Sequence, residues 1–321
     1  MPRLLLLALV TLLAAPGTWL RTPLPPPDYR DQLQFRPLAM SQSRLGLFTV
    51  EGAWVVASPH AHFGSYSALV SLGDGTLLAG TDRGRLLRFA PPGADSELVE
   101  FPSPQGAETE PKKYRDLESL TRDPDTGTVW AGYEASNSIA KLDAKWREER
   151  RVHPEAMSEW SSNSGAESLV RLADGSFLVM AEGRPGKGDG TVPAVLFPGD
   201  PTDGVEPIAF SYAPPRGFRP VDAAALPDGR VLILLRTVHW GLPPRFAGRI
   251  AVADPRLIAE GRVWRSRVLA RLEAPLPVDN YEGLALERSD DGGVRAWLIS
   301  DDNDSAFQRT LLLKLSLPDD L

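Results

Sequence analysis

Acidic residues stand at both ends of short apolar segments in this sequence, in a pattern that could bind a cation. One set opens an apolar segment in five stretches of the chain, with serine in place of the acid once: Ser67, Glu118, Glu167, Asp222 and Glu282. A second set closes the next apolar segment in each stretch: Asp82, Glu134, Glu182, Arg236 and Asp301, the last followed by Asp302 and Asn303. Carboxylate oxygens are the ligands that hard divalent cations prefer. If the two sets meet, they form an acidic site that contains one arginine.

The five stretches share one pattern of elements. Each has an apolar segment, a turn with Asp or Gly, a second apolar segment and a third after a loop, most clearly in residues 278–317. They begin about fifty residues apart and show no helical periodicity, which is typical of propeller blades. We therefore predict an all-β fold, a β-propeller with five blades. Two earlier apolar segments, 45–50 and 53–57 around a Glu51-Gly52 turn, leave six blades as an alternative.

The last repeat is one strand short of a four-stranded blade. We expect the N-terminal strand to complete this blade and close the ring, because closure leaves no sheet edge exposed. The first two strands of a blade are antiparallel, so the start of the first and the end of the second lie at the same mouth of the central channel. This topology brings the two sets of residues together.

Crowded carboxylates repel one another, and raised pKa values, arginine partners or a bound cation relieve that repulsion. We expect a divalent cation, with calcium as the first candidate. Its expected ligands are Glu118, Glu167, Glu282, Asp301 and Asp302. Alternatively, these acids only accept hydrogen bonds from backbone amides at the strand ends. Arg236 fits either an ion pair with the acids or a clamp for an anion such as phosphate.

Composition excludes several classes of function. The 321 residues carry 35 Lys and Arg, 42 Asp and Glu and a net charge of −7, which argues against a nucleic-acid surface. The absence of cysteine excludes disulfides, thiolate catalysis and Cys-ligated zinc. His60 and His62 offer two imidazoles near the same mouth, but such a pair without a third ligand is more often incidental.

The N-terminus has the pattern of an export signal. Residues 1–20 contain a basic start and an apolar run, Leu4–Ala15, which predicts a signal peptide, with an uncleaved membrane anchor as the alternative. Residues 21–44 are a Pro-rich spacer and residues 45–321 the propeller domain. We expect a periplasmic or secreted protein that contacts a membrane only through such an anchor.

Three motifs resemble those of the phytase-like family, whose members are described as having an "esterase-like activity of phytase". They are Asn280-Tyr281-Glu282-Gly283, Ser300-Asp301-Asp302-Asn303 and Gln308-Arg309-Thr310, and the resemblance extends over about residues 45–317. It implies a secreted or periplasmic bacterial β-propeller with phosphoesterase or esterase activity. The chain lacks the Asp-Ala-x-Asp-Asp-Pro-Ala and Asn-Asn-x-Asp-x-Arg motifs of the alkaline β-propeller phytases, which puts phytate hydrolysis in question.

We therefore expect a monomeric, metal-assisted hydrolase of phosphate or carboxylic esters of small molecules. Its expected catalytic residues are Asp222, Glu282, Arg236 and Arg309, with an arginine holding the anionic group. Two alternatives remain open. One is a non-catalytic propeller of the cell envelope that binds a ligand or partner and carries a structural cation. The other is a lactonase-like hydrolase.

Overall fold

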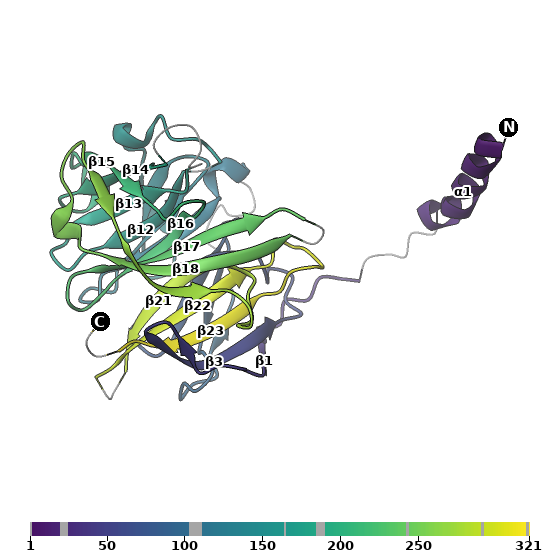
Figure 1. Ribbon diagram of the computed structural model, residues 1–321, viewed down its shortest axis with the longest axis horizontal. Helices are drawn as coiled ribbons and strands as arrows, with labels where there is room; N and C mark the ends of the chain where they lie inside the picture. Colours follow the sequence, from purple (N-terminus) through teal and green to yellow (C-terminus); the bar gives the residue numbers. More distant parts are fainter. Residues whose placement is uncertain are drawn as a thin grey trace.

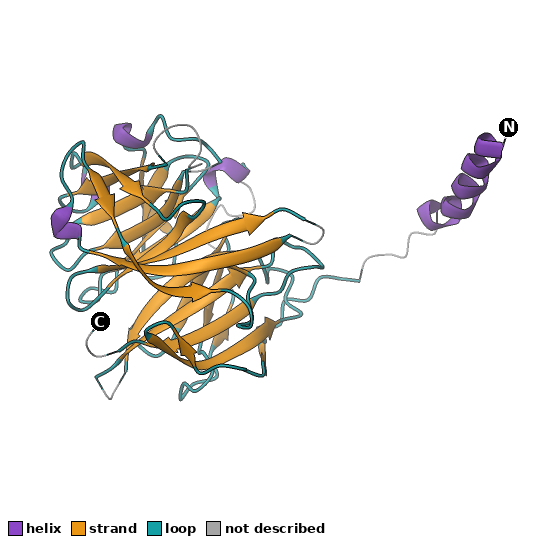
Figure 2. Ribbon diagram, viewed as in Figure 1, coloured by secondary structure: helices purple, strands orange, loops and turns teal. Residues whose placement is uncertain are grey.

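The body of the molecule is built almost entirely of strands (Figures 1 and 2). Five sheets form the blades of a β-propeller, and their first strands contact one another in a closed ring. In this computed structural model the described residues are 2–19, 25–102, 111–163, 165–183, 190–241, 244–289, 292–318 and 321. The ring runs in the order β4, β8, β12, β16 and β21, and β21 contacts β4 again. The prediction of five blades is confirmed, and the six-bladed alternative is wrong.

The blades are built in chain order from the following strands. Blade 1 contains β4 (Tyr66–Ser71), β5 (Leu77–Thr81), β6 (Leu86–Phe89) and β7 (Val99–Glu100). Blade 2 contains β8 (Leu117–Arg122), β9 (Val129–Tyr133), β10 (Ser138–Leu142) and β11 (Glu148–Val152). Blade 3 contains β12 (Ala166–Arg171), β13 (Phe177–Ala181), β14 (Val192–Phe197), β15 (Ile208–Ala213) and β19 (Val263–Arg265).

The last two blades use segments that are farther apart in the chain. Blade 4 contains β16 (Arg219–Ala225), β17 (Val231–His239), β18 (Arg245–Ala253) and β20 (Arg267–Leu272). Blade 5 contains β21 (Asn280–Arg288), β22 (Val294–Asp301), β23 (Leu311–Ser316), β3 (Phe48–Ala57), β1 (Gln34–Pro37) and β2 (Arg44–Leu45). Short 3-10 turns lie between strands: η1 (Lys112–Tyr114), η2 (Glu155–Met157), η3 (Pro201–Asp203) and η4 (Pro255–Leu257).

The N-terminal strand closes the ring, as predicted, because β3 pairs antiparallel with β23. The predicted turn at Glu51-Gly52 is wrong. β3 runs through it as one strand, with Val50 opposite Leu315 and Gly52 opposite Lys314, so that Glu51 is an extra, bulged residue. The Glu51 carboxylate accepts hydrogen bonds from Nε of Arg295 at 3.0 and 3.1 Å, and this ion pair holds the bulge within the blade.

The core consists of five apolar clusters, one between each pair of neighbouring blades. Leu234 of blade 4 and Leu298 of blade 5, for example, belong to one cluster, and both are fully buried. The second strands are covered on both faces, which explains their continuous apolar runs, such as Val231–Leu235. Each blade therefore has a fixed position, and residues at the ends of different first strands meet around the channel.

The predicted spacer, residues 21–44, is partly built into this body. Residues 34–37, within the predicted spacer, form β1 at the outer edge of blade 5, where Phe35 packs beside Phe89. The helix α1 (Pro2–Trp19) lies apart from the propeller (Figure 1). Among the described residues, no helix combines the length and the apolar character needed to cross a membrane.

Candidate functional site at the acidic mouth

Each first strand begins with a β-bulge, and three of these bulges carry an acid at the mouth. In four blades the residue left out of the pairing is Ser67, Glu118, Glu167 or Glu282. A bulge leaves one residue unpaired and turns its side chain out of the regular alternation. The acids that follow the second strands lie at the same end of the channel, so the predicted meeting of the two sets takes place.

Asp222 does not occupy the position that the sequence comparison assigned to it. In blade 4 the bulged residue is Val221, and Asp222 pairs with Leu234 in regular register. The Asp222 carboxylate is fully buried and accepts hydrogen bonds from the N–H of Ala223 at 2.8 Å and of Leu284 at 2.6 Å. Burial raises its pKa well above the usual range, although amide donors favour the ionised form.

The predicted position in blade 4 was wrong by one residue. Val221 lies five residues before Leu226, where the turn begins, just as Glu167 lies five residues before Leu172 in blade 3, so the distance to the turn identifies the bulged residue. The partners of Asp222 include the backbone of Leu284 and of Leu69, each two residues further into the channel than the bulges of their strands. Asp222 therefore joins β16 to β21 and β4 below the mouth.

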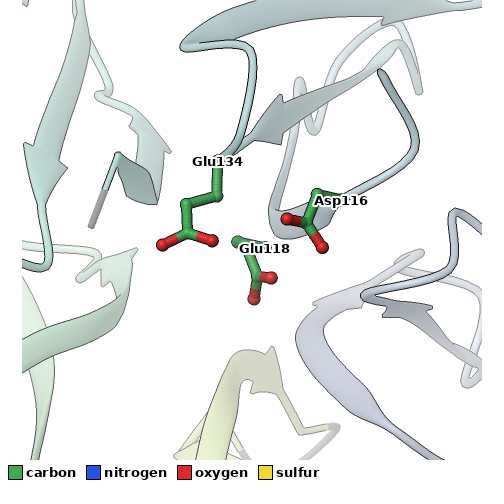
Figure 3. Close-up of side chains that lie close together, drawn as sticks. All are labelled: Asp116, Glu118 and Glu134. Carbon is green, nitrogen blue, oxygen red and sulfur yellow. The ribbon is translucent and has the colours of Figure 1, made fainter. Parts of the chain in front are cut away.

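Three carboxylates at the mouth converge closely enough to hold one cation (Figure 3). Asp116, Glu118 and Glu134 each offer an oxygen, and these oxygens lie within 4.8 Å of one another. The backbone supports the arrangement, because the N–H of Glu134 donates to the carbonyl of Asp116 at 2.9 Å. An all-oxygen donor set fits a hard cation such as calcium.

Asp116 was absent from the sequence-based set. Glu118 alone among the predicted ligands belongs to this trio, whereas Glu134 was predicted only as a neighbour at the mouth. The signal for Asp116 was its place two residues before Glu118 in the extended segment that enters β8. Residues two apart in an extended chain point to the same side.

Crowding and burial of the carboxylates at the mouth raise the pKa values of Glu118, Glu134 and Glu167. Burial, together with Glu282, Glu134 and Asp116, raises the pKa of Glu118 well above its usual range. Burial also raises the pKa of Glu134 to about 7, and a hydrogen bond with the Glu167 side chain partly offsets that rise. The pKa of Glu167 is likewise well above its usual range, because it is buried beside Glu118. A bound cation or retained protons would relieve this repulsion.

Arg236 ties three blades together at the mouth. Its Nη2 donates to Oε1 of Glu182 at 2.5 Å, and its Nη1 donates to Oε1 of Glu282 and, at 2.7 Å, to Oδ1 of Asn280. Burial alone would lower the pKa of this guanidinium, but Glu282 and Glu182 hold it above the usual range. Arg219 binds the other oxygen of Glu182 at 3.1 Å, and its side chain is 36% exposed.

The remaining predicted residues have different surroundings. Asp301 is buried and accepts the N–H of Asn303 at 2.7 Å; burial and then Glu282 raise its pKa well above the usual range. The Asp302 carboxylate accepts the N–H of Ser65 at 3.0 Å and the hydroxyl of Thr310 at 2.8 Å, so it joins blade 5 to the entrance of blade 1. Arg309 is exposed, and its backbone N–H donates to Asp279 at 3.0 Å.

The histidine pair belongs to an aromatic cluster. The His60 ring stacks on Phe101, with ring centroids 3.7 Å apart, and Tyr29 meets it edge-on at 5.6 Å. The N–H of His62 donates to Nδ1 of His60 at 3.1 Å, which occupies one of the possible ligand atoms. Burial lowers the pKa of His60.

Comparison with known proteins places the chain in a family. A model of the phytase-like family, "esterase-like activity of phytase", matches residues 61–304. A search of curated proteins finds no match. Among solved structures, the PQQ-bound aldose sugar dehydrogenase from Streptomyces coelicolor is 14% identical with a TM-score of 0.46, over 90% of this chain and 100% of that chain. Glutaminyl cyclase from Myxococcus xanthus is 13% identical with a TM-score of 0.46, over 83% and 97%.

The Pan2 WD40 domain from Neurospora crassa is 11% identical with a TM-score of 0.40, over 88% of this chain and 98% of that chain. At these identities and scores, the solved structures carry no argument about the ligand or activity of this protein. The family match is of another kind, since it spans the first strands of all five blades and most of the acidic mouth. Because that match covers well over half of its length, the chain belongs to the phytase-like family.

Proposed function

We propose that the acidic mouth is a metal-assisted site for the hydrolysis of phosphate or carboxylic esters of small molecules. The observation that carries the proposal is the convergence of Asp116, Glu118 and Glu134 within 4.8 Å, beside the Arg219–Glu182 pair. Glu182 is close enough to Glu134 to raise the pKa of Glu134, so the three carboxylates and the Arg219–Glu182 pair belong to one site.

Asp116, Glu118 and Glu134 are the residues that would hold a divalent cation, with calcium as the first candidate. When bound, such an ion polarises an ester oxygen and lowers the pKa of water. Of the sequence-based ligands, Glu167, Glu282 and Asp301 lie around this trio and contribute negative charge. Asp302 and Asp222 use their carboxylates to join strands, and we leave them out of the reactive set.

Arg219 is the arginine best placed to receive the anionic group of a substrate. Its side chain is 36% exposed, and within the described ranges its one ion pair is with Glu182, which leaves further N–H donors for a ligand. Arg236 has its donors committed to Glu182, Glu282 and Asn280, so it orients the acids around it. Glu134, with a pKa of about 7 and a hydrogen bond to Glu167, can take up or release a proton at neutral pH.

The test compares the metal-depleted protein with protein given calcium, magnesium, manganese or zinc. Thermal unfolding reports binding, and a panel of aryl phosphates, carboxylic esters and lactones reports turnover. We expect one ion to raise the unfolding temperature and to restore hydrolysis. Glu118→Gln should lose both effects, whereas Glu260→Gln, an exposed acid on another surface, should lose neither.

The outcomes separate the candidate functions. Ion binding without hydrolysis of any ester would overturn the enzymatic proposal and leave a binding propeller with a structural cation. Turnover confined to lactones would make it lactonase-like. We further propose export to the periplasm or medium as a monomer, which cell fractionation and sedimentation test.

A further inference from the structure

A cavity of about 1100 Å³ lies at the end of the channel opposite the acidic mouth. Its wall includes one apolar or small residue from the first strand of each blade: Leu69, Leu120, Val170, Ala223 and Leu284. The turns that follow these strands form its rim. On β8, Glu118 belongs to the acidic mouth and Arg122 to this rim, about 13 Å apart along the strand. The cavity and the acidic site are therefore separate.

Arginines stand at the ends of three first strands on this rim. The last paired residue of the first strand, taken blade by blade, is Ser71, Arg122, Arg171, Ala225 and Arg288. All five line the cavity, and three of them are arginines. On β8, β12 and β21 an acidic residue at the bulge is thus followed by an arginine at the other end of the strand, four residues later on β8 and β12 and six residues later on β21.

Two of these arginines have guanidinium groups available for a ligand. Arg171 pairs with Asp123 at 3.3 Å. By contrast, within the part of the chain that the structure describes, the side chains of Arg122 and Arg288 make no ion pair or hydrogen bond, although Arg122 is half-buried. Arg122 reaches toward blade 1, because a Cβ added at Gly73 would lie 2.9 Å from its Nη1.

The other charged side chains of the wall are mostly neutralised locally. Arg295 and Lys314 share Glu51, while Asp74 pairs with Arg88. Glu287 accepts the indole N–H of Trp297 at 2.9 Å. Asp95 lies in the exposed loop between β6 and β7. Among the described residues, five basic and three acidic side chains line the cavity: Arg122, Arg171, Arg288, Arg295 and Lys314 against Asp74, Asp95 and Glu287.

We propose that this basic mouth binds a small anionic molecule with an apolar body, namely an aryl or alkyl carboxylate, sulfonate or phosphate. The apolar wall receives the body, and Arg122 and Arg288 receive the anionic group. Guanidinium groups suit this role because they stay charged and present paired N–H donors to the oxygens of such anions. A cavity of this size is in the range of small-molecule sites.

The test uses 8-anilinonaphthalene-1-sulfonate, a fluorescent aryl sulfonate that offers no ester to hydrolyse, and the neutral N-phenyl-1-naphthylamine as its matched analogue. Both are titrated into the full chain. The double variant Arg122→Gln/Arg288→Gln should weaken sulfonate binding about tenfold and leave binding of the neutral analogue unchanged. The control Arg265→Gln/Arg267→Gln removes the same charge from exposed positions on β19 and β20 and should bind like the unaltered protein.

Equal sulfonate affinity in the arginine double variant and the unaltered protein would overturn the proposal, as would an equal loss in the control. Sulfonate binding at the basic mouth does not depend on the residues of the acidic mouth. Glu118→Gln should keep full sulfonate affinity, and the arginine double variant should keep the metal response. A loss of sulfonate binding in Glu118→Gln would contradict the separation of the two sites.

Discussion

Nη2 of Arg236 lies 2.5 Å from Oε1 of Glu182, and this contact joins blade 4 to blade 3 at the channel mouth. The same guanidinium also binds Glu282 of blade 5, and all three side chains are largely buried. The Arg236 side chain thus links three neighbouring blades of the ring. The consequence for stability can be tested directly.

Replacing Arg236 by methionine should destabilise the fold strongly. The change leaves Glu282 buried without a cation and Glu182 with Arg219 alone, and breaking a buried pair in this way costs about 3–5 kcal/mol. Urea unfolding at neutral pH measures the loss. Arg219→Gln, at the more exposed contact with the same Glu182, is the matched control and should cost about 1 kcal/mol or less. Equal losses in both variants would contradict the central role of Arg236.

The stability of the metal-free protein should fall as pH rises from about 5 to about 8. The pKa of Glu134 is about 7 in the folded state. Because this is above its unfolded value, the folded state holds a proton that the unfolded state releases, and stability is lost as pH rises through that range. The effect should be on the order of 2 kcal/mol. Thermal unfolding in the presence of a chelator measures it.

A divalent cation should remove most of that pH dependence, since it neutralises the carboxylates in place of protons. Glu134→Gln should flatten the pH profile even without metal. Metal-free stability that stays level or rises between these pH values would show that the mouth acids are not protonated in the folded state.

Asp222→Ala should cost about 3–5 kcal/mol. The substitution leaves the buried N–H groups of Leu284 and Ala223 without acceptors, at about 1–3 kcal/mol each, and adds a small void. Asp222→Asn keeps one carbonyl acceptor at nearly the same size and should cost about 1 kcal/mol. Unfolding of both variants at pH 7 tests the pair. A loss for Asn as large as for Ala would mean that the ionised carboxylate is required.

Removal of β1 to β3 should open the ring. A chain of residues 58–321 leaves the edge of β23 unpaired, and an exposed edge strand promotes association. We expect aggregation in size-exclusion chromatography and loss of cooperative unfolding. A chain of residues 25–321, which keeps β1, should elute and unfold like the full chain. A stable monomer of residues 58–321 would contradict closure by β3.

Local patterns were enough to predict the propeller. Apolar segments separated by turns indicate strands, and their recurrence about every fifty residues indicates blades. Both patterns can be read from the sequence because they depend only on residues that are near one another in the chain. The missing strand of the last repeat led to the correct closure by β3 for the same reason. Within the mouth, Glu118 was identified correctly as part of the acidic set because it follows this repeat.

The tertiary structure decided the register of the bulges and the partners of each acid. A shift of one residue turns a side chain to the other face of a strand. In blade 4 the observed register leaves Val221, not Asp222, at the bulge. Asp116, Glu118 and Glu134 meet within blade 2, where β8 pairs with β9, whereas Arg236 joined acids from two other blades only once the ring had closed. The sequence by itself determined the blades and the acidic residues at one end of the first strands. Which side chains meet across blades depended on packing between blades, since contacts such as that of Arg236 with Glu182 link residues far apart in the chain.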